Sequence, residues 1–284
     1  MQEYEMDQWH KRIAQWWTGD TLYLSVPFTW LIGEADTIAN YWREHNKTVL
    51  IGGPGLMEPN DCLHFQPILF HNPCATFTTR GCPNACPFCG VPKLEGDLRE
   101  IPDFRPAPTI CDNNLLAASR NHIRRVIDSL KVFSYVDFNQ GLDARLFDSE
   151  IAGWLGELRC KVRFAFDHWN MEGMVKDAIA LCRKYSSRKI GVYVLVGFDD
   201  SPSEAVAKLE KVRSWGIRPT PMRFQPLDAK VKNGYAGPGW TELELRRVTR
   251  YYSRLRFLEH IPFEEYEYGG SFDQLALETI QHST

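Results

Sequence analysis

Three cysteines lie close together between Gly81 and Gly90, and they constrain the chain more than any other feature. Cys82, Cys86 and Cys89 have the spacing C-x3-C-x2-C. Thiolates are the usual ligands of iron–sulfur clusters, and cysteines on one loop can bind several irons of one cluster. A [4Fe-4S] cube with only three cysteine ligands keeps one iron open to a small molecule. The loop therefore predicts a cluster site with a free coordination position.

Other chemistries fit this loop less well. A structural zinc site needs four Cys or His ligands, and the nearest histidines, His64 and His71, precede the loop. Disulfide pairing would leave an odd cysteine, and the chain shows no secretory signal. An iron–sulfur site accounts best for the spacing, with zinc as the main alternative.

The motif Cys82-x3-Cys86-x-Phe88-Cys89 resembles the signature of the radical S-adenosylmethionine (radical SAM) superfamily. The resemblance implies that the three cysteines bind a [4Fe-4S] cluster and that its fourth iron binds the amino and carboxylate groups of SAM. It also implies that an electron from a flavodoxin- or ferredoxin-type donor splits SAM into methionine and a 5′-deoxyadenosyl radical. This radical removes a hydrogen atom from a substrate.

Charge and hydrophobic patterning narrow the class of protein. The formal net charge of −3 gives no overall basic footprint for nucleic acid. No apolar run approaches the roughly 18 residues of a membrane span. Residues 1–20 carry charges and tryptophans, unlike a secretory signal. We therefore expect a cytoplasmic protein that does not bind a membrane.

The remaining cysteines are scattered along the chain. None forms a second C-x2-C pair, which argues against a domain with auxiliary clusters. Buried thiols are the expected state, because free cysteine behaves as a small apolar residue. These cysteines are Cys62, Cys74, Cys111, Cys160 and Cys182.

The N-terminal part predicts a small unit before the main domain. Residues 1–19 have the pattern of an amphipathic helix, and residues 21–28, 34–45 and 48–51 predict strand, helix and strand. This β-α-β unit resembles a fragment of the Rossmann-like cobalamin-binding domain that precedes many radical SAM cores. It is too short for that domain and lacks an Asp-x-His-x-x-Gly ligand motif, so we expect no cobalamin.

From Cys74 onward, strands alternate with crossovers that are mostly helical. Parallel strands with right-handed crossovers are the expected result, and six such units close part of a barrel. The fold expected is therefore α/β, a partial (β/α)6 barrel with a short N-terminal β-α-β appendage. The domains expected are 1–73, 74–260 for the barrel, and a tail at 261–284. The six predicted strands are residues 75–79, 108–111, 135–140, 161–166, 190–196 and 219–225.

The carboxyl ends of these strands carry polar residues, where parallel barrels place their chemistry. By resemblance, Asp112-Asn113-Asn114 stands where the family binds the SAM amino group, Arg145 where it binds the carboxylate, and Asp167 near the ribose. Strand-end Asp and Asn also cap helices, and pairing of Arg145 with Asp143 or Asp148 is the alternative for that residue. The expected SAM contacts are Phe88, Asp112, Asn113, Asn114, Gln140, Arg145, Asp167, Val196, Gly197, Arg223 and Gln225.

The substrate is not specified by the sequence. His168 and Tyr193 are the candidate catalytic residues, and residues 226–240 form either a lid or a plain connection. Isomerisation, C–C bond formation and methylation are all open. A modified nucleotide or nucleic acid is one substrate hypothesis, for which Arg120, Arg124 and Arg125 supply local charge. The alternative function is a non-catalytic iron–sulfur or zinc module for electron transfer or structure.

Overall fold

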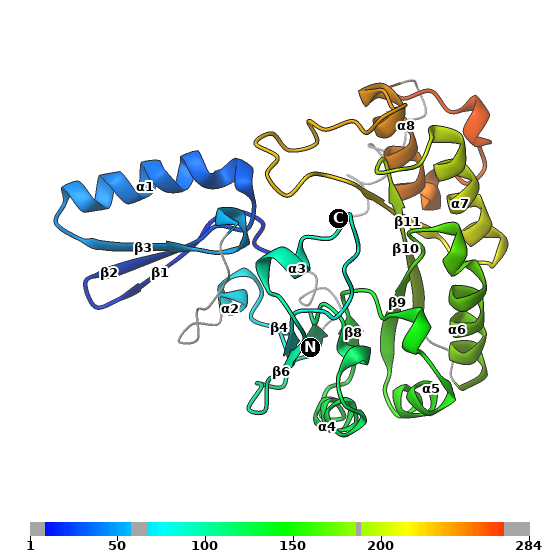
Figure 1. Ribbon diagram of the computed structural model, residues 1–284, viewed down its shortest axis with the longest axis horizontal. Helices are drawn as coiled ribbons and strands as arrows, with labels where there is room; N and C mark the ends of the chain where they lie inside the picture. The colour runs from blue at the N-terminus through cyan, green and yellow to red at the C-terminus, as the bar shows by residue number, and fades with distance from the viewer. Residues whose placement is uncertain (1–8, 58–66, 186–188, 270–284) are drawn as a thin grey trace.

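Two units with separate hydrophobic cores make up the part of the chain that the structure describes (Figure 1). The structure is a computed structural model, and it describes residues 9–57, 67–185 and 189–269. The N-terminal unit has a three-stranded sheet, and the larger unit has a six-stranded sheet with a two-stranded ribbon. Within these ranges no helix has the length and apolar character needed to cross a membrane.

The six-stranded sheet is parallel throughout, and its strand order β4-β7-β8-β9-β10-β11 follows the chain. This confirms the predicted α/β fold with a parallel sheet, because each strand reaches its neighbour by a crossover. The strands are β4 (Ala75–Thr76), β7 (Thr109–Ile110), β8 (Val136–Phe138), β9 (Cys160–Ala165), β10 (Lys189–Val196) and β11 (Pro219–Arg223).

Helices fill four of the crossovers and follow the last strand. In Figure 1, α5, α6 and α7 lie along one side of the strands β9 to β11. The helices are α4 (Arg120–Leu130), α5 (Ser149–Gly156), α6 (Glu172–Tyr185), α7 (Pro202–Ser214), α8 (Glu242–Ser253) and the short α9 (Leu255–Leu258).

Side-chain caps mark the starts of α5, α7 and α8. Ser201 and Glu204 form a capping box at α7, and Thr241 and Glu244 form another at α8. Asp148 accepts the Ile151 N–H at the start of α5. Such caps satisfy backbone N–H groups that have no partner inside the helix.

The two faces of the main sheet bury different kinds of side chain, apolar on one face and charged on the other. Val162 and Phe164 of β9 join the hydrophobic core, whereas Arg163 points to the opposite face because side chains alternate along a strand. Arg163 pairs there with Asp137 of β8: Nη2 lies 3.0 Å from Oδ2, and Nη1 donates to the Phe138 carbonyl at 2.9 Å. The two side chains are only 8% and 6% exposed. This face therefore carries a buried polar layer.

The first strand of the main sheet is shorter than predicted. Residues 75–79 split into β4 and β5 (Thr79–Arg80), and β5 pairs with β6 (Arg99–Glu100) in the separate ribbon. The Asp112 carboxylate accepts the Thr78 N–H at 2.5 Å and the Thr79 N–H at 3.0 Å. At this point the Thr78 and Thr79 N–H groups are bound by a side-chain carboxylate, and pairing with β7 ends at Thr76.

The N-terminal unit confirms the predicted β-α-β arrangement. β2 (Thr21–Ser25) and β3 (Thr48–Gly52) pair in parallel, and α1 (Ile32–Glu44) connects them. Two further short helices follow along the chain, α2 (Ile68–His71) and α3 (Val91–Leu94).

The helix predicted for residues 1–19 is wrong where the chain is described. Ala14–Thr18 form the strand β1, which pairs antiparallel with β2, and residues 9–13 are not helical. Trp16 lies opposite Tyr23 with the rings stacked 5.5 Å apart, and such aromatic cross-strand pairs stabilise a sheet. Residues 1–8 lie outside the described part.

The predicted tail, residues 261–284, begins packed against α8. Tyr266 is fully buried, and Arg247 of α8 donates to the carbonyls of Tyr266 at 2.8 Å and Phe263 at 2.7 Å. Residues 270–284 lie outside the described part.

Replacing Arg163 by Met tests the buried polar layer. We expect Arg163→Met to lower the free energy of unfolding by about 3–5 kcal/mol, because it leaves Asp137 buried without its cation. Urea titration of the purified variants measures this. The double variant Arg163→Met/Asp137→Leu should recover most of the loss. Arg120→Met, which breaks an exposed pair, should cost at most about 1 kcal/mol.

Candidate functional site

The three-cysteine loop follows β5, and its entry requires glycine. Gly81 has φ +74°, and a Cβ there would lie 2.1 Å from the Asp97 carbonyl oxygen. The Cys82 N–H then donates to the Gly96 carbonyl at 3.2 Å, and the Cys89 N–H donates to the Cys86 carbonyl at 3.0 Å. The loop is therefore folded back on the residues that follow it.

All three loop thiols are free and half-buried. Burial raises the pKa of Cys86 and of Cys89, and the charges of neighbouring loop thiolates raise both further. The thiols thus lie near enough to influence one another. In the described ranges, no three His, Cys, Asp or Glu side chains converge closely enough to hold a single metal ion.

One of the thiols is held in a hydrogen-bond network. Cys82 Sγ accepts the Asn84 backbone N–H and the Asn114 Nδ2, both at 3.5 Å. Both asparagine side chains also donate to Asp143 Oδ2, each at 3.1 Å. The Asp143 side chain is 6% exposed. This network joins the cysteine loop to the ends of β7 and β8.

Arg145 pairs with Asp143, which is one of the two alternatives to a ligand contact. Its Nε lies 2.8 Å from Asp143 Oδ1 and its Nη2 lies 2.7 Å from Oδ2. The side chain stays 43% exposed, and its charge lowers the pKa of Cys86 against the larger effect of burial. The guanidinium therefore lies beside the cysteine loop with part of its surface accessible.

The three residues Asp112, Asn113 and Asn114 do not all have the same role. Asp112 and Asn113 hold the chain: Asp112 binds Thr78 and Thr79, and Asn113 Nδ2 donates to Glu95 Oε2 at 2.6 Å. Burial raises the pKa of Asp112 to about 6.

Asn114 differs from the two residues before it. It is 3% exposed, and its Oδ1 has no hydrogen-bond partner among the described residues. A buried acceptor without a donor costs free energy, so this oxygen is suited to a donor supplied by a ligand.

The end of β9 contributes a carboxylate to the same region. Asp167 is half-buried, and burial raises its pKa to about 6 while the Lys208 and Arg145 charges oppose the rise. Its own charge raises the pKa of Cys86. The next residue, His168, is exposed, and its Nδ1 accepts the Asn170 N–H at 3.2 Å as a helix cap.

The remaining candidate residues at the strand ends hydrogen-bond to parts of the chain outside the cysteine loop or lie exposed to solvent. The Tyr193 hydroxyl donates to the Asn139 carbonyl at 2.9 Å. Gly197 has φ +81°, and its N–H donates to Asp200 Oδ1 at 2.8 Å, with Val196 buried just before it. Gln140 is exposed.

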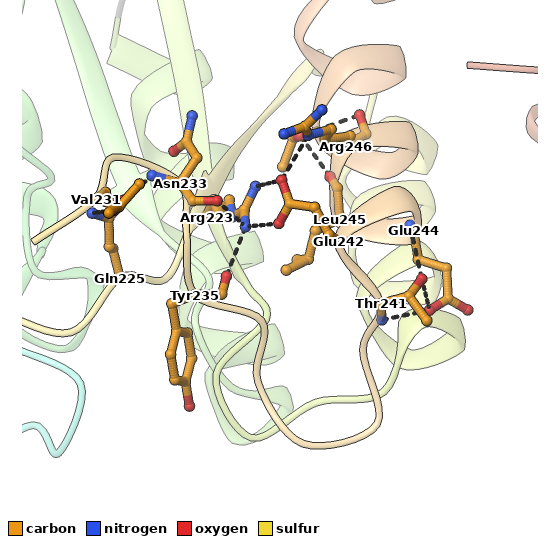
Figure 2. Close-up of polar contacts among 11 residues, drawn as sticks. Arg223, Gln225, Val231, Asn233, Tyr235, Thr241, Glu242, Glu244, Leu245 and Arg246 are labelled. Carbon is orange, nitrogen blue, oxygen red and sulfur yellow. Dashed lines mark hydrogen bonds and ion pairs between the residues drawn. The ribbon is translucent and has the colours of Figure 1, made fainter. Parts of the chain in front are cut away.

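Arg223 and Gln225 hold the 226–240 connection, as Figure 2 shows. Arg223 Nη2 donates to the carbonyls of Asn233 at 2.8 Å and Tyr235 at 2.7 Å, and it pairs with Glu242 of α8. Gln225 Oε1 accepts the Asn233 N–H at 2.9 Å. Both side chains therefore bind other parts of the chain, and the buried Arg223 Nε has no hydrogen-bond partner among the described residues.

This connection reaches both the cysteine loop and the N-terminal unit. A Cβ on Gly90 would lie 3.0 Å from Leu227 Cδ1, and the Thr29 hydroxyl donates to the Ala229 carbonyl. Tyr235 packs edge-on against Phe224, with ring centroids 5.4 Å apart.

A series of packed aromatic rings connects Phe224 to the cysteine loop. Phe224 packs against Phe198 at 4.7 Å, and Phe198 packs against Phe88 at 5.7 Å. Phe88 thus lies in contact with the end of β10 rather than isolated on its loop.

The three arginines that were considered for nucleic-acid binding lie on α4, and each contacts other side chains of the protein. Arg124 pairs with Asp128 and Glu157, and Arg120 pairs with Asp148. Arg125 contacts His122 and lies over the Phe104 ring. The charges of Arg120 and Arg124 are therefore paired locally, whereas Arg125 contacts an imidazole and an aromatic ring.

Sequence reasoning missed several residues around the loop. Asn84, Glu95 and Lys208 were not among the candidates. Glu95 Oε2 accepts the Gly81 N–H at 3.0 Å, and Lys208 Nζ lies 3.0 Å from Asp200 Oδ2 and 3.1 Å from the Asp167 carbonyl. The apolar pattern of α7 around Lys208 was the available signal, since it places a lysine on the buried face.

The fold and site together define an α/β protein with a three-cysteine loop at the carboxyl edge of a parallel sheet. Comparisons with protein-family models, curated proteins and solved structures found no match.

Replacing Arg223 by Met tests what holds the 226–240 connection. We expect Arg223→Met to raise amide hydrogen exchange across residues 226–240 by about tenfold or more, because local stability depends on such contacts. Arg246→Met is the matched control, since Arg246 also binds Glu242, at 2.6 Å, but makes no hydrogen bond or ion pair with residues 226–240 in the described part of the chain. Equal exchange in the two variants would contradict this role.

Asp167 gives a pH prediction. We expect its carboxyl to titrate with a midpoint of about 6 in ¹³C NMR, with Asp167→Asn assigning the signal. Because burial raises the pKa in the folded state, ionisation opposes folding. The contribution of this group to stability is therefore most favourable below the unfolded value of 3.8 and declines as the pH rises through about 6. A midpoint near 4 would show that the carboxylate is well solvated.

Proposed function

We propose that this protein is a radical SAM enzyme, in which a [4Fe-4S] cluster on Cys82, Cys86 and Cys89 cleaves SAM reductively. The observation that carries the proposal is the meeting of that cysteine loop with polar groups from three successive strand ends. Asn114 donates to Cys82 Sγ, and the charges of Arg145 and Asp167 act on Cys86. A loop used only as a structural staple needs none of these groups.

The donor set suits an iron–sulfur cube. The three thiols lie on one half-buried loop and form no disulfide, and a cube takes thiolates on separate irons of one cluster. When bound, the cluster supplies the electron that splits SAM into methionine and a 5′-deoxyadenosyl radical, which takes a hydrogen atom from substrate. The protein's part is to bind, orient and exclude water.

Three side chains beside the loop match the polar groups of SAM. Asn114 Oδ1 is a buried acceptor that lacks a donor, which suits the ammonium group. Arg145 has exposed surface for the carboxylate, since a guanidinium binds a carboxylate through two hydrogen bonds. Asp167, ionised above its pKa of about 6, can accept hydrogen bonds from ribose hydroxyls.

The sheet supports the same proposal at the level of fold. Its six strands are parallel and adjacent in chain order, as in a partial (β/α)6 barrel. In such a barrel the face that carries Arg163 and Tyr193 is the interior, and the substrate enters above them. Tyr193 is then a candidate substrate contact, whereas His168 serves as a helix cap.

The surroundings of the reaction follow from its chemistry. An oxygen-sensitive cluster requires a reducing compartment such as the cytoplasm, and a flavodoxin- or ferredoxin-type protein is the expected electron donor. We expect no cobalamin. The substrate is a small molecule or a modified nucleotide, and a hydrogen-abstracting isomerisation needs no second cluster.

Anaerobic reconstitution with iron and sulfide tests the function. The wild-type chain should bind about four irons and turn brown, because each cube contains four. With dithionite and SAM it should release 5′-deoxyadenosine. Cys86→Ala should lose both properties, whereas Cys74→Ala, which removes another half-buried thiol outside the loop, should keep them.

Two outcomes would reject the proposal. Binding of one zinc per chain with no iron would identify the zinc-binding alternative. A full cluster that never yields 5′-deoxyadenosine would identify an electron-transfer module instead.

A further inference from the structure

The Asp143 carboxylate joins three segments that are far apart in the sequence. Its Oδ2 accepts from Asn84 on the cysteine loop and from Asn114 after β7, each at 3.1 Å. Its Oδ1 accepts the Arg145 backbone N–H at 3.1 Å and the Arg145 Nε at 2.8 Å. Arg145 Nη2 also donates to Oδ2, at 2.7 Å, so the Arg145 guanidinium binds both carboxylate oxygens and the two asparagines bind only Oδ2.

This arrangement fixes which end of each amide faces which neighbour. An amide has a donor end and an acceptor end, and only the donor end can face an ionised carboxylate. For Asn114, one Nδ2 hydrogen then goes to Asp143 and the other to Cys82 Sγ. Its Oδ1 is left turned away from both, which agrees with the absence of a partner for that atom in the described residues.

We propose that Asp143 is a positioning residue of the site. It orients Asn114 so that an N–H donor points at the Cys82 sulfur and an acceptor stays open for a ligand, and it holds the Arg145 guanidinium beside them. The effect on a cluster rests on the function proposed above. The orientation itself does not, because it depends only on side chains within the chain.

The consequence is an unequal set of sulfur ligands. Cys82 Sγ accepts two N–H donors, from Asn84 and Asn114. Hydrogen bonds to cluster sulfurs stabilise the reduced state and raise the reduction potential. Asp143 therefore influences the potential through Asn114, without touching the cluster.

Asp143→Asn is the informative change because it keeps the shape and removes one acceptor oxygen. The single amide oxygen can face either the two asparagines and Arg145 Nη2, or the Arg145 backbone N–H and Nε, and the donors that meet the new NH₂ group lose their acceptor. Asp148→Asn is the matched control. Asp148 also accepts a backbone N–H, from Ile151 at 2.9 Å, and pairs with an arginine, Arg120, without contacting the cysteine loop.

The first measurement needs no metal. Hydrogen exchange in the full-length apo protein should rise about tenfold or more for the amides of residues 82–90 in Asp143→Asn. Asp148→Asn should change exchange only at the start of α5. If the loop of Asp143→Asn exchanges like that of wild type, the positioning role is overturned, whether or not the protein binds a cluster.

The second measurement uses the reconstituted protein. Asp143→Asn should keep the iron content of wild type, because all three cysteines remain, but its midpoint potential should change, because the Asn114 donor is released and the negative charge of Asp143 is removed. Its dissociation constant for SAM should rise about tenfold or more, since a lost charge-assisted contact has such an effect. A potential equal to that of wild type at equal iron content would overturn the influence on the cluster.

A second variant keeps the test decisive if Asp143→Asn does not fold. Asn114→Leu keeps the branching at Cγ and the number of heavy atoms, removes the same N–H donor to Cys82 and leaves Asp143 with Asn84 and Arg145. Because it keeps the charge of Asp143, it should shift the midpoint potential to more negative values. If wild-type protein takes up no iron, the proposed function fails while the hydrogen-exchange result still decides the role of Asp143.

Discussion

One buried carboxylate fastens the cysteine loop to the main sheet. Asp112, just after β7, accepts the backbone N–H groups of Thr78 and Thr79 and the Thr78 hydroxyl. Burying this group costs enough to raise its pKa to about 6, and the three donors offset that cost because they replace water. The chain leaves the sheet after β4, and the cysteine loop starts from a point fixed by the neighbouring strand.

Local sequence patterns were sufficient to predict the elements of the main sheet. The apolar run at residues 190–196 marked β10, and the Ser/Thr-x-x-Glu patterns at Ser201 and Thr241 are local signals for the starts of α7 and α8. These signals are local, because a cap or a strand pattern depends on residues within a few positions. The chain order of the strands then followed from short crossovers, without any information on long-range contacts.

The features that local patterns did not predict involve partners that are distant in the sequence. Residues 14–18 have a pattern compatible with a helix, and the strand forms because β2 offers Tyr23 opposite Trp16. At Arg223, nothing nearby indicates whether the guanidinium meets a ligand or the carbonyls of Asn233 and Tyr235. The orientation of Asn114 is likewise set by a carboxylate 29 residues later. Residue type predicted that polar groups gather at the strand ends, but not which of them bind one another.

The charges beside the cysteine loop favour a cationic ligand at that place. Asp143 and Asp167 lie near thiols that carry negative charge when they bind metal, and Arg145 is shared with Asp143. Like charges in a half-buried site repel strongly because little water screens them. A sulfonium with an ammonium group relieves this repulsion, whereas a phosphate would add to it. If the substrate is a nucleotide, we therefore expect its phosphates to lie away from the cysteines, and the paired arginines of α4 offer them no obvious site.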